Sequence, residues 1–116
     1  MHEFSIIYNV LRAVEDVAKQ NHFNQVDKII LRIGKLRQVM PDFLQFAFEA
    51  SSEDTISEGA KLEIIEVPIT IKCLTCQKEF EAKRQTYICP HCEGIKLEIL
   101  SGKELLIDSI EGEKAE

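Results

Sequence analysis

Apolar side chains recur every three or four residues along the first part of the chain, with polar and charged residues between them. The stripe consists of Phe4, Ile7, Leu11, Val14 and Ala18. Such spacing is typical of an amphipathic helix that buries one face. The pattern predicts a helix of about five turns. It ends in the asparagine-containing stretch at residues 19–24.

Residues 26–34 change to a two-residue period, which predicts a strand that stops at Gly34. Helical spacing returns after this strand, and a second amphipathic helix is predicted to begin at Pro41. Proline fits the first position of a helix, and Asp42 suits the positive end of its dipole. The polar stretch at residues 51–59 ends this helix.

Residues 60–72 form a β-rich run with isoleucine or valine at alternate positions. Pro68 interrupts this run and cannot donate a ladder hydrogen bond, so we expect a bulge or an edge there. Two more short strands are predicted, before and after Gly102. The last strand is too short to stand alone, and it most simply joins the strands at 26–33 and 60–67 in one sheet.

Size and composition suit one domain with a small satellite. The chain has 116 residues, of which 45% are hydrophobic and 29% charged, and no stretch approaches the roughly 18 apolar residues of a membrane span. The first residues also lack the basic and apolar regions of a signal peptide, so we expect a cytoplasmic protein without membrane insertion. The net charge of -6 lowers the expectation of nucleic-acid binding.

Four cysteines form two C-x-x-C pairs separated by 12 residues, and they are the strongest signal in the chain. They are Cys73, Cys76, Cys89 and Cys92. Two such pairs can close a tetrahedral thiolate shell around Zn(II), which leaves no open position for catalysis and predicts a structural site. A redox C-x-x-C pair and an iron–sulfur or rubredoxin-like iron site are the alternatives.

The segment that holds the cysteines, residues 71–101, would be an insertion in the sheet domain. It carries five basic and four acidic residues, which is no basic stripe for nucleic acid. We therefore expect an α+β fold in which two helices pack on a small mixed β-sheet, with an inserted zinc-ribbon-like β module. A zinc-ribbon module that binds protein or nucleic acid is the alternative function. The sequence shows no phosphate loop, nucleophile elbow or open zinc site, so we expect no enzyme.

The first three residues bring several nitrogen donors together. These are the α-amine of Met1, the backbone nitrogens of His2 and Glu3, and the His2 imidazole. Nitrogen donors in a plane suit Ni(II) or Cu(II), and Glu3 could add an oxygen ligand or orient the imidazole. By itself this signal is weak, because an exposed chain end is the ordinary explanation of a histidine at position 2.

Two other histidines have ordinary explanations. His91 lies inside the second cysteine pair, where it is either a turn residue or a spare imidazole that responds to metal or pH. His22 follows the first predicted helix, and we expect it to be a solvated loop residue.

Five motifs in order along the chain resemble the HypA/HybF family of nickel-insertion accessory proteins. The motifs are MHEFS, LRIGKL, FAFEA, CLTC with CPHC, and ELLIDSIE. The resemblance covers nearly the whole chain. It is more specific than the cysteine pairs, which alone would fit hundreds of families.

The resemblance implies a metallochaperone, not an enzyme. It would bind Ni(II) through Met1, His2 and Glu3, with His2 as the essential ligand, and structural Zn(II) through the four cysteines. Residues 1–70 plus 102–116 would form the nickel-binding α/β domain and residues 71–101 the zinc-binding domain. In some members, histidines near the zinc site take part in metal and pH sensing, which raises a secondary role for His91.

The resemblance also implies partners. Family members act with the GTPase HypB and deliver nickel to the large subunit of [NiFe] hydrogenase, and some also serve urease. The sequence leaves open whether the chain is a monomer or a homodimer. It does not reveal the partner surface, for which we expect the exposed face of the first helix beside the nickel residues.

Overall fold

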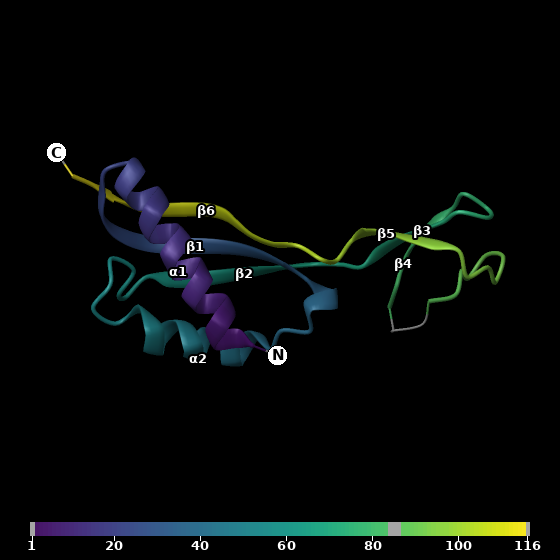
Figure 1. Ribbon diagram of the computed structural model, residues 1–116, viewed down its shortest axis with the longest axis horizontal. Helices are drawn as coiled ribbons and strands as arrows, with labels where there is room; N and C mark the ends of the chain where they lie inside the picture. Colours follow the sequence, from purple (N-terminus) through teal and green to yellow (C-terminus); the bar gives the residue numbers. More distant parts are fainter. Residues whose placement is uncertain (1, 84–86, 116) are drawn as a thin grey trace. The chain divides into compact units, whose positions relative to one another are not determined.

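The computed structural model describes residues 2–83 and 87–115 of the chain. Two α-helices, one 3₁₀ turn and six strands occur in the described residues (Figure 1). In chain order they are α1 (Glu3–Gln20), β1 (Phe23–Gly34), η1 (Lys35–Arg37), α2 (Pro41–Ser52), β2 (Lys61–Val67), β3 (Thr70–Cys73), β4 (Glu79–Glu81), β5 (Leu97–Ser101) and β6 (Leu105–Lys114).

The chain divides into two compact units. The first comprises Met1–Arg32, Val39–Ile65 and Leu106–Glu116, and the second comprises Ile33–Gln38 and Glu66–Leu105. Compactness does not show whether either unit folds alone, so the expected division into domains stays a prediction. Neither α-helix in the described ranges is long and apolar enough to cross a membrane.

The first unit contains both helices and most of a three-stranded sheet with the order β2-β1-β6. Strands β1 and β2 run in the same direction, and β6 runs against them (Figure 1). The backbone N–H of Ala115 donates to the carbonyl of His22 at 2.6 Å, so the end of the chain pairs beside the start of β1. The prediction that the last strand joins the two earlier ones in a mixed sheet is confirmed.

Aliphatic side chains from both helices and the central strand fill the core of this unit. They include Ile7, Val10, Val14 and Ala18 of α1, Val26, Ile29 and Leu31 of β1, and Leu44 and Ala47 of α2. Of the predicted apolar stripe of the first helix, Ile7, Val14 and Ala18 face inward, whereas Leu11 is half-buried and Phe4 is exposed. Each fully buried Val, Leu or Ile stabilises the fold by roughly 1.5–3 kcal/mol relative to an exposed one.

The β-rich run at residues 60–72 divides between two sheets. Strand β2 ends at Val67, and β3 begins at Thr70 in an antiparallel sheet with the order β4-β3-β5. Pro68 lies between them, where it has no N–H to donate, and its carbonyl accepts a hydrogen bond from Ser101 Oγ at 2.8 Å. The expected irregularity at Pro68 is thus a change of sheet, followed by a register shift between Thr70 and Ile71.

The second sheet determines where the first cysteine pair lies within its unit. Ile71 pairs with Phe80 of β4 and with Ile99 of β5. Cys73, at the end of β3, pairs with Leu97. The sheet therefore brings the first cysteine pair and the segment that follows the second pair to the same end of the unit.

Candidate metal centres

The four cysteine sulfurs gather at one point of the second unit. All four Sγ atoms lie within 4.8 Å of one another. The Sγ atoms of Cys73 and Cys92 are 3.5 Å apart, and those of Cys76 and Cys89 are 3.6 Å apart. Four sulfurs on a zinc tetrahedron are about 3.8 Å apart at Zn–S distances of about 2.3 Å. The cluster is therefore suited to a structural Zn(II), and these separations are far longer than a disulfide bond.

The first cysteine pair forms a tight backbone turn. The N–H of Gln77 donates to the carbonyl of Cys73 at 2.8 Å, and the N–H of Cys73 donates to the carbonyl of Lys78 at 2.9 Å. Gln77 adopts a left-handed conformation with φ of 65°. The turn folds the chain back so that Cys73 and Cys76 present their sulfurs to the same point.

The second pair repeats this turn residue for residue. Glu93 donates its N–H to the Cys89 carbonyl, and Cys89 donates its N–H to the Gly94 carbonyl, both at 2.9 Å. Glu93 has a φ of 61°. The two turns correspond although their sequences share only the cysteines, and the spacing alone does not reveal the left-handed residue after each pair.

Gly94 explains how closely the second turn approaches the sulfurs. A Cβ at this position would lie 3.2 Å from the Sγ of Cys92 and 3.6 Å from that of Cys73. These separations leave little room for a side chain beside the cluster. A residue without a side chain therefore lets the turn close against the metal ligands.

The cysteines differ in their environment. Cys73 and Cys89 are fully buried, whereas Cys92 is exposed. The Cys76 N–H donates to the Cys73 sulfur and lowers the pKa of Cys73 to about 6. The Gly94 N–H favours the thiolate of Cys92, but the hydrogen bond of the Cys92 thiol to the Cys73 sulfur and partial desolvation raise the pKa of Cys92 to about 12. The Cys73 thiolate is therefore stabilised by the backbone, whereas a cation that binds Cys92 must displace its proton.

His91 contributes its backbone to the cluster. Its N–H points toward the Sγ of Cys89 at 3.4 Å, while the residue is exposed. Its imidazole is not among the clustered ligand atoms. A role of His91 in metal or pH sensing stays a prediction.

The predicted nickel residues lie at the start of α1. Met1 lies outside the described residues, His2 is the exposed N-cap residue of the helix, and Glu3 is its first residue. The helical hydrogen bonds begin with the N–H of Ile6, which donates to the His2 carbonyl at 3.0 Å. The amide nitrogens of His2 and Glu3 therefore precede the first donor of the helix ladder.

Glu3 is turned into the protein. The residue is only 6% exposed, and its carboxylate accepts a hydrogen bond from the Met40 N–H at 3.1 Å. This hydrogen bond lowers the pKa of Glu3, although desolvation opposes the shift. The contact joins the start of α1 to the residue before α2, and no sequence signal pointed to it.

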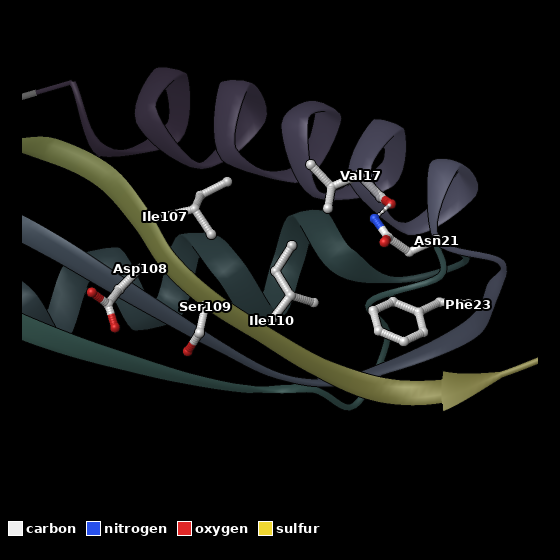
Figure 2. A pocket seen from close by; sticks show the side chains of 7 residues that line it. All are labelled: Val17, Asn21, Phe23, Ile107, Asp108, Ser109 and Ile110. Carbon is white, nitrogen blue, oxygen red and sulfur yellow. Dashed lines mark hydrogen bonds between the residues drawn. The ribbon is translucent and has the colours of Figure 1, made fainter.

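An open groove lies elsewhere on the first unit, between the end of α1 and β6. Figure 2 shows its lining, which includes Val17, Phe23 and Ile110. Two of its polar side chains are engaged, since the Asn21 amide donates to the Val17 carbonyl at 2.8 Å and Asp108 pairs with Arg32 at 2.7 Å. Among the residues that the structure describes, neither a cysteine nor a histidine lines the groove.

Comparison with known proteins identifies relatives over nearly the full length. Residues 1–112 match a family model described as hydrogenase/urease nickel incorporation, metallochaperone, HypA. Hydrogenase maturation factor HypA 2 of Bradyrhizobium diazoefficiens is 40% identical over 111 residues, which cover 96% of this chain and 98% of that protein. Hydrogenase maturation factor HypA of Aquifex aeolicus is 37% identical over 111 residues, which cover 96% of both chains.

The fold also matches solved structures. The solution structure of the nickel metallochaperone HypA from Helicobacter pylori has a TM-score of 0.71 at 22% identity, covering 99% of this chain and all of that one. A second solution structure of a HypA protein has a TM-score of 0.72 at 24% identity, covering 97% of this chain and 96% of that one. At these identities the likeness concerns the fold, and it agrees with the predicted α+β class.

Proposed function

Because the chain belongs to the HypA family of hydrogenase and urease nickel-incorporation metallochaperones, we propose that its first three residues bind Ni(II) and deliver the ion during maturation of [NiFe] hydrogenase. The proposed ligand set consists of Met1, His2 and Glu3. Membership in this family of maturation factors also means that the chain is not an enzyme. Its proposed role is to bind a metal ion and transfer it to another protein.

The observation that supports the nickel site best is the position of His2. His2 is exposed immediately before α1. The first residue of that helix, Glu3, is buried and hydrogen-bonded. The imidazole can therefore reach an ion from solvent while Glu3 holds the backbone in place. The Met1 amine, two amide nitrogens and the imidazole would form small chelate rings, which suit Ni(II).

Glu3 has two separate roles in this proposal, one for its backbone nitrogen and one for its carboxylate. Its backbone nitrogen would be a ligand, whereas its carboxylate already accepts the Met40 N–H. The carboxylate would then position the chelating backbone and leave direct binding to nitrogen atoms. A site at a chain end can also release its ion stepwise, because the donors nearest the end can leave first.

The cysteine cluster would hold Zn(II) through Cys73, Cys76, Cys89 and Cys92. A shell of four thiolates has no open position, so this metal would stabilise the fold and would not be passed on. The proposal therefore assigns two metals to two separate sets of residues. Zinc is structural, and nickel is cargo.

The partners follow from the proposed delivery. A maturation factor acts together with other components of the maturation machinery. We assign a HypB-type GTPase as the protein that acts with this chain and the hydrogenase large subunit as the recipient, with urease as a further recipient.

The test replaces the proposed ligand and blocks the amine. We expect His2→Ala, and a variant with residues added before Met1, to lose nickel binding in equilibrium dialysis while retaining one zinc per chain. His22→Asn is the matched control, because His22 is also exposed and asparagine tolerates its left-handed φ of 61°. Nickel binding equal to that of the parent in both test variants would overturn the N-terminal site.

A further inference from the structure

Three aromatic rings cluster on the surface where α1 meets α2. The ring centroid of Phe4 lies 5.9 Å from that of Phe43 and 6.3 Å from that of Phe46, in edge-on arrangements. The Phe43 and Phe46 centroids are 6.0 Å apart. Ring contacts at these distances stabilise the rings against one another.

These rings are not core residues. Phe4 is 45% exposed, Phe43 44% and Phe46 58%, and Tyr8, one helical turn beyond Phe4, is 59% exposed. We call these four residues the aromatic surface. Single exposed apolar residues are ordinary, but a group of ordered aromatic side chains in one place is typical of a protein-binding site.

The aromatic surface adjoins the proposed nickel residues. Phe4 lies two positions after His2, and the hydrogen bond between Glu3 and the Met40 N–H holds the start of α2 at the same end of α1 (Figure 1). A protein that takes nickel from His2 must bring its own ligands within bonding distance of the ion. Its surface must therefore cover the residues around His2, and the aromatic surface is the exposed apolar part of that region.

We propose that the aromatic surface is the docking site for the protein that receives nickel from the first three residues. This inference rests on the proposed function. The receiving surface would have an apolar centre that takes the rings of Phe43 and Phe46. Docking there aligns the recipient with His2 before any ligand exchange takes place.

The charges on the α2 side of the aromatic surface are acidic and indicate the rim of the partner, whereas on the α1 side the Arg12 guanidinium lies 5.7 Å from the centroid of the Tyr8 ring. Residues 39–60 contain five acidic residues and no lysine, arginine or histidine. Two of the acidic residues, Asp42 and Glu49, are exposed on α2 beside the rings. A partner with lysine or arginine around its apolar centre would complement this charge. A second copy of the same chain would bring acidic groups against acidic groups across a two-fold axis, which opposes self-association.

The test measures docking separately from nickel. Biolayer interferometry would compare the affinities of nickel-free parent and variants for the purified, nickel-free large subunit of the [NiFe] hydrogenase from the same organism. We expect Phe43→Ser/Phe46→Ser to bind at least roughly tenfold more weakly than the parent. Leu106→Ser is the matched control, since Leu106 is 45% exposed and lies on β6, and we expect its affinity to change by less than about twofold.

A charge variant keeps the test decisive if loss of the rings disturbs folding. Asp42→Lys/Glu49→Lys changes only exposed positions, and we expect it to weaken binding and to flatten the dependence of affinity on salt. Circular dichroism would verify that each variant is folded.

Three results would contradict the proposal that the aromatic surface is the docking site. They are failure of the parent to bind the large subunit, parental affinity in both double variants, or a Phe43→Ser/Phe46→Ser variant that changes only self-association in light scattering. None of these results depends on nickel. Loss of the N-terminal nickel site would show instead in equilibrium dialysis of the parent and His2→Ala.

Discussion

At the scale of single residues, Glu3 joins the proposed nickel site to the rest of the fold. Polar groups that are buried need hydrogen-bond partners, and here a carboxylate satisfies the N–H of Met40 just before α2 begins. His2 is one residue away and exposed. The two adjacent residues therefore have different roles. The Glu3 side chain fixes the backbone, and the His2 side chain is available to a metal.

The first prediction concerns this hydrogen bond. We expect Glu3→Ala to lower the melting temperature by about 5 °C, because the part-buried Met40 N–H loses its acceptor. Glu3→Gln keeps an acceptor oxygen and should lower it less. Thermal denaturation followed by circular dichroism measures both, with the exposed Glu15→Ala as control. Equal melting temperatures for all three variants would show that the carboxylate does not brace the helix.

The resemblance implied nickel-binding residues at positions 1 to 3, which stay a prediction, and nothing in the sequence indicated the orientation of Glu3. Position 3 reads as an ordinary first-turn acidic residue, which suits a helix dipole. Its inward direction depends on Met40, which is 37 residues away along the chain. A contact across that separation leaves no trace in local spacing.

At the scale of elements, two glycines mark a close approach between the end of β1 and the connection from β5 to β6. A Cβ on Gly34 would overlap the backbone carbonyl of Gly102. The Gly34 N–H donates to the Glu104 carbonyl at 2.8 Å, and the Leu36 N–H donates to the Gly102 carbonyl at 2.9 Å. The predicted end of the strand at Gly34 is confirmed, and the structure adds that this glycine is needed for close packing of backbones.

The second prediction tests this close approach. We expect Gly34→Ala to reduce the free energy of unfolding by about 2 kcal/mol or more, since backbone atoms must move to admit the methyl group. Gly59→Ala is the control. Gly59 has open space around it, and its φ of 78° makes alanine cost only about 1 kcal/mol. Urea titration measures both, and an equal loss in the two variants would contradict the packing role of Gly34.

Strand patterns predicted where β structure occurs but not that the run at residues 60–72 divides between two sheets. The alternation of residues 60–72 continues through Pro68, while the structure assigns β2 and β3 to different sheets. Alternation reports which side chains share a face, and it contains no information on the neighbouring strand. Similarly, β6 extends to Lys114 because β1 offers a partner for the polar end of the chain.

At the scale of the whole molecule, each of the two compact units contains one candidate metal site. The cysteine shell lies within Glu66–Leu105, and the proposed nickel residues belong to the unit that contains both helices. The zinc-ribbon alternative explains only the first of these features. The family match over residues 1–112 includes both and therefore favours the metallochaperone.

The third prediction concerns zinc removal. We expect a chelator to unfold the cysteine segment and to leave the helical core folded, because all four ligands lie between residues 73 and 92. Two-dimensional NMR would show collapsed amide dispersion for residues 71–101 and retained shifts for α1.

Cys73→Ala provides an independent way to break the shell in that experiment. Removal of this buried ligand should give the same partly folded state without chelator. One zinc per chain in the variant would contradict the four-cysteine shell, and loss of helical signals on chelation would contradict separate folding of the core.

The sequence by itself determined the helices, most of the strands, the two cysteine pairs and the family, because these depend on local spacing and on short motifs that are each read within a few consecutive residues. Tertiary structure alone decided the inward direction of Glu3, the division of strands at Pro68 and the gathering of three phenylalanines on one surface. Each of these depends on contacts between residues far apart in sequence, which form only when the core brings their elements together.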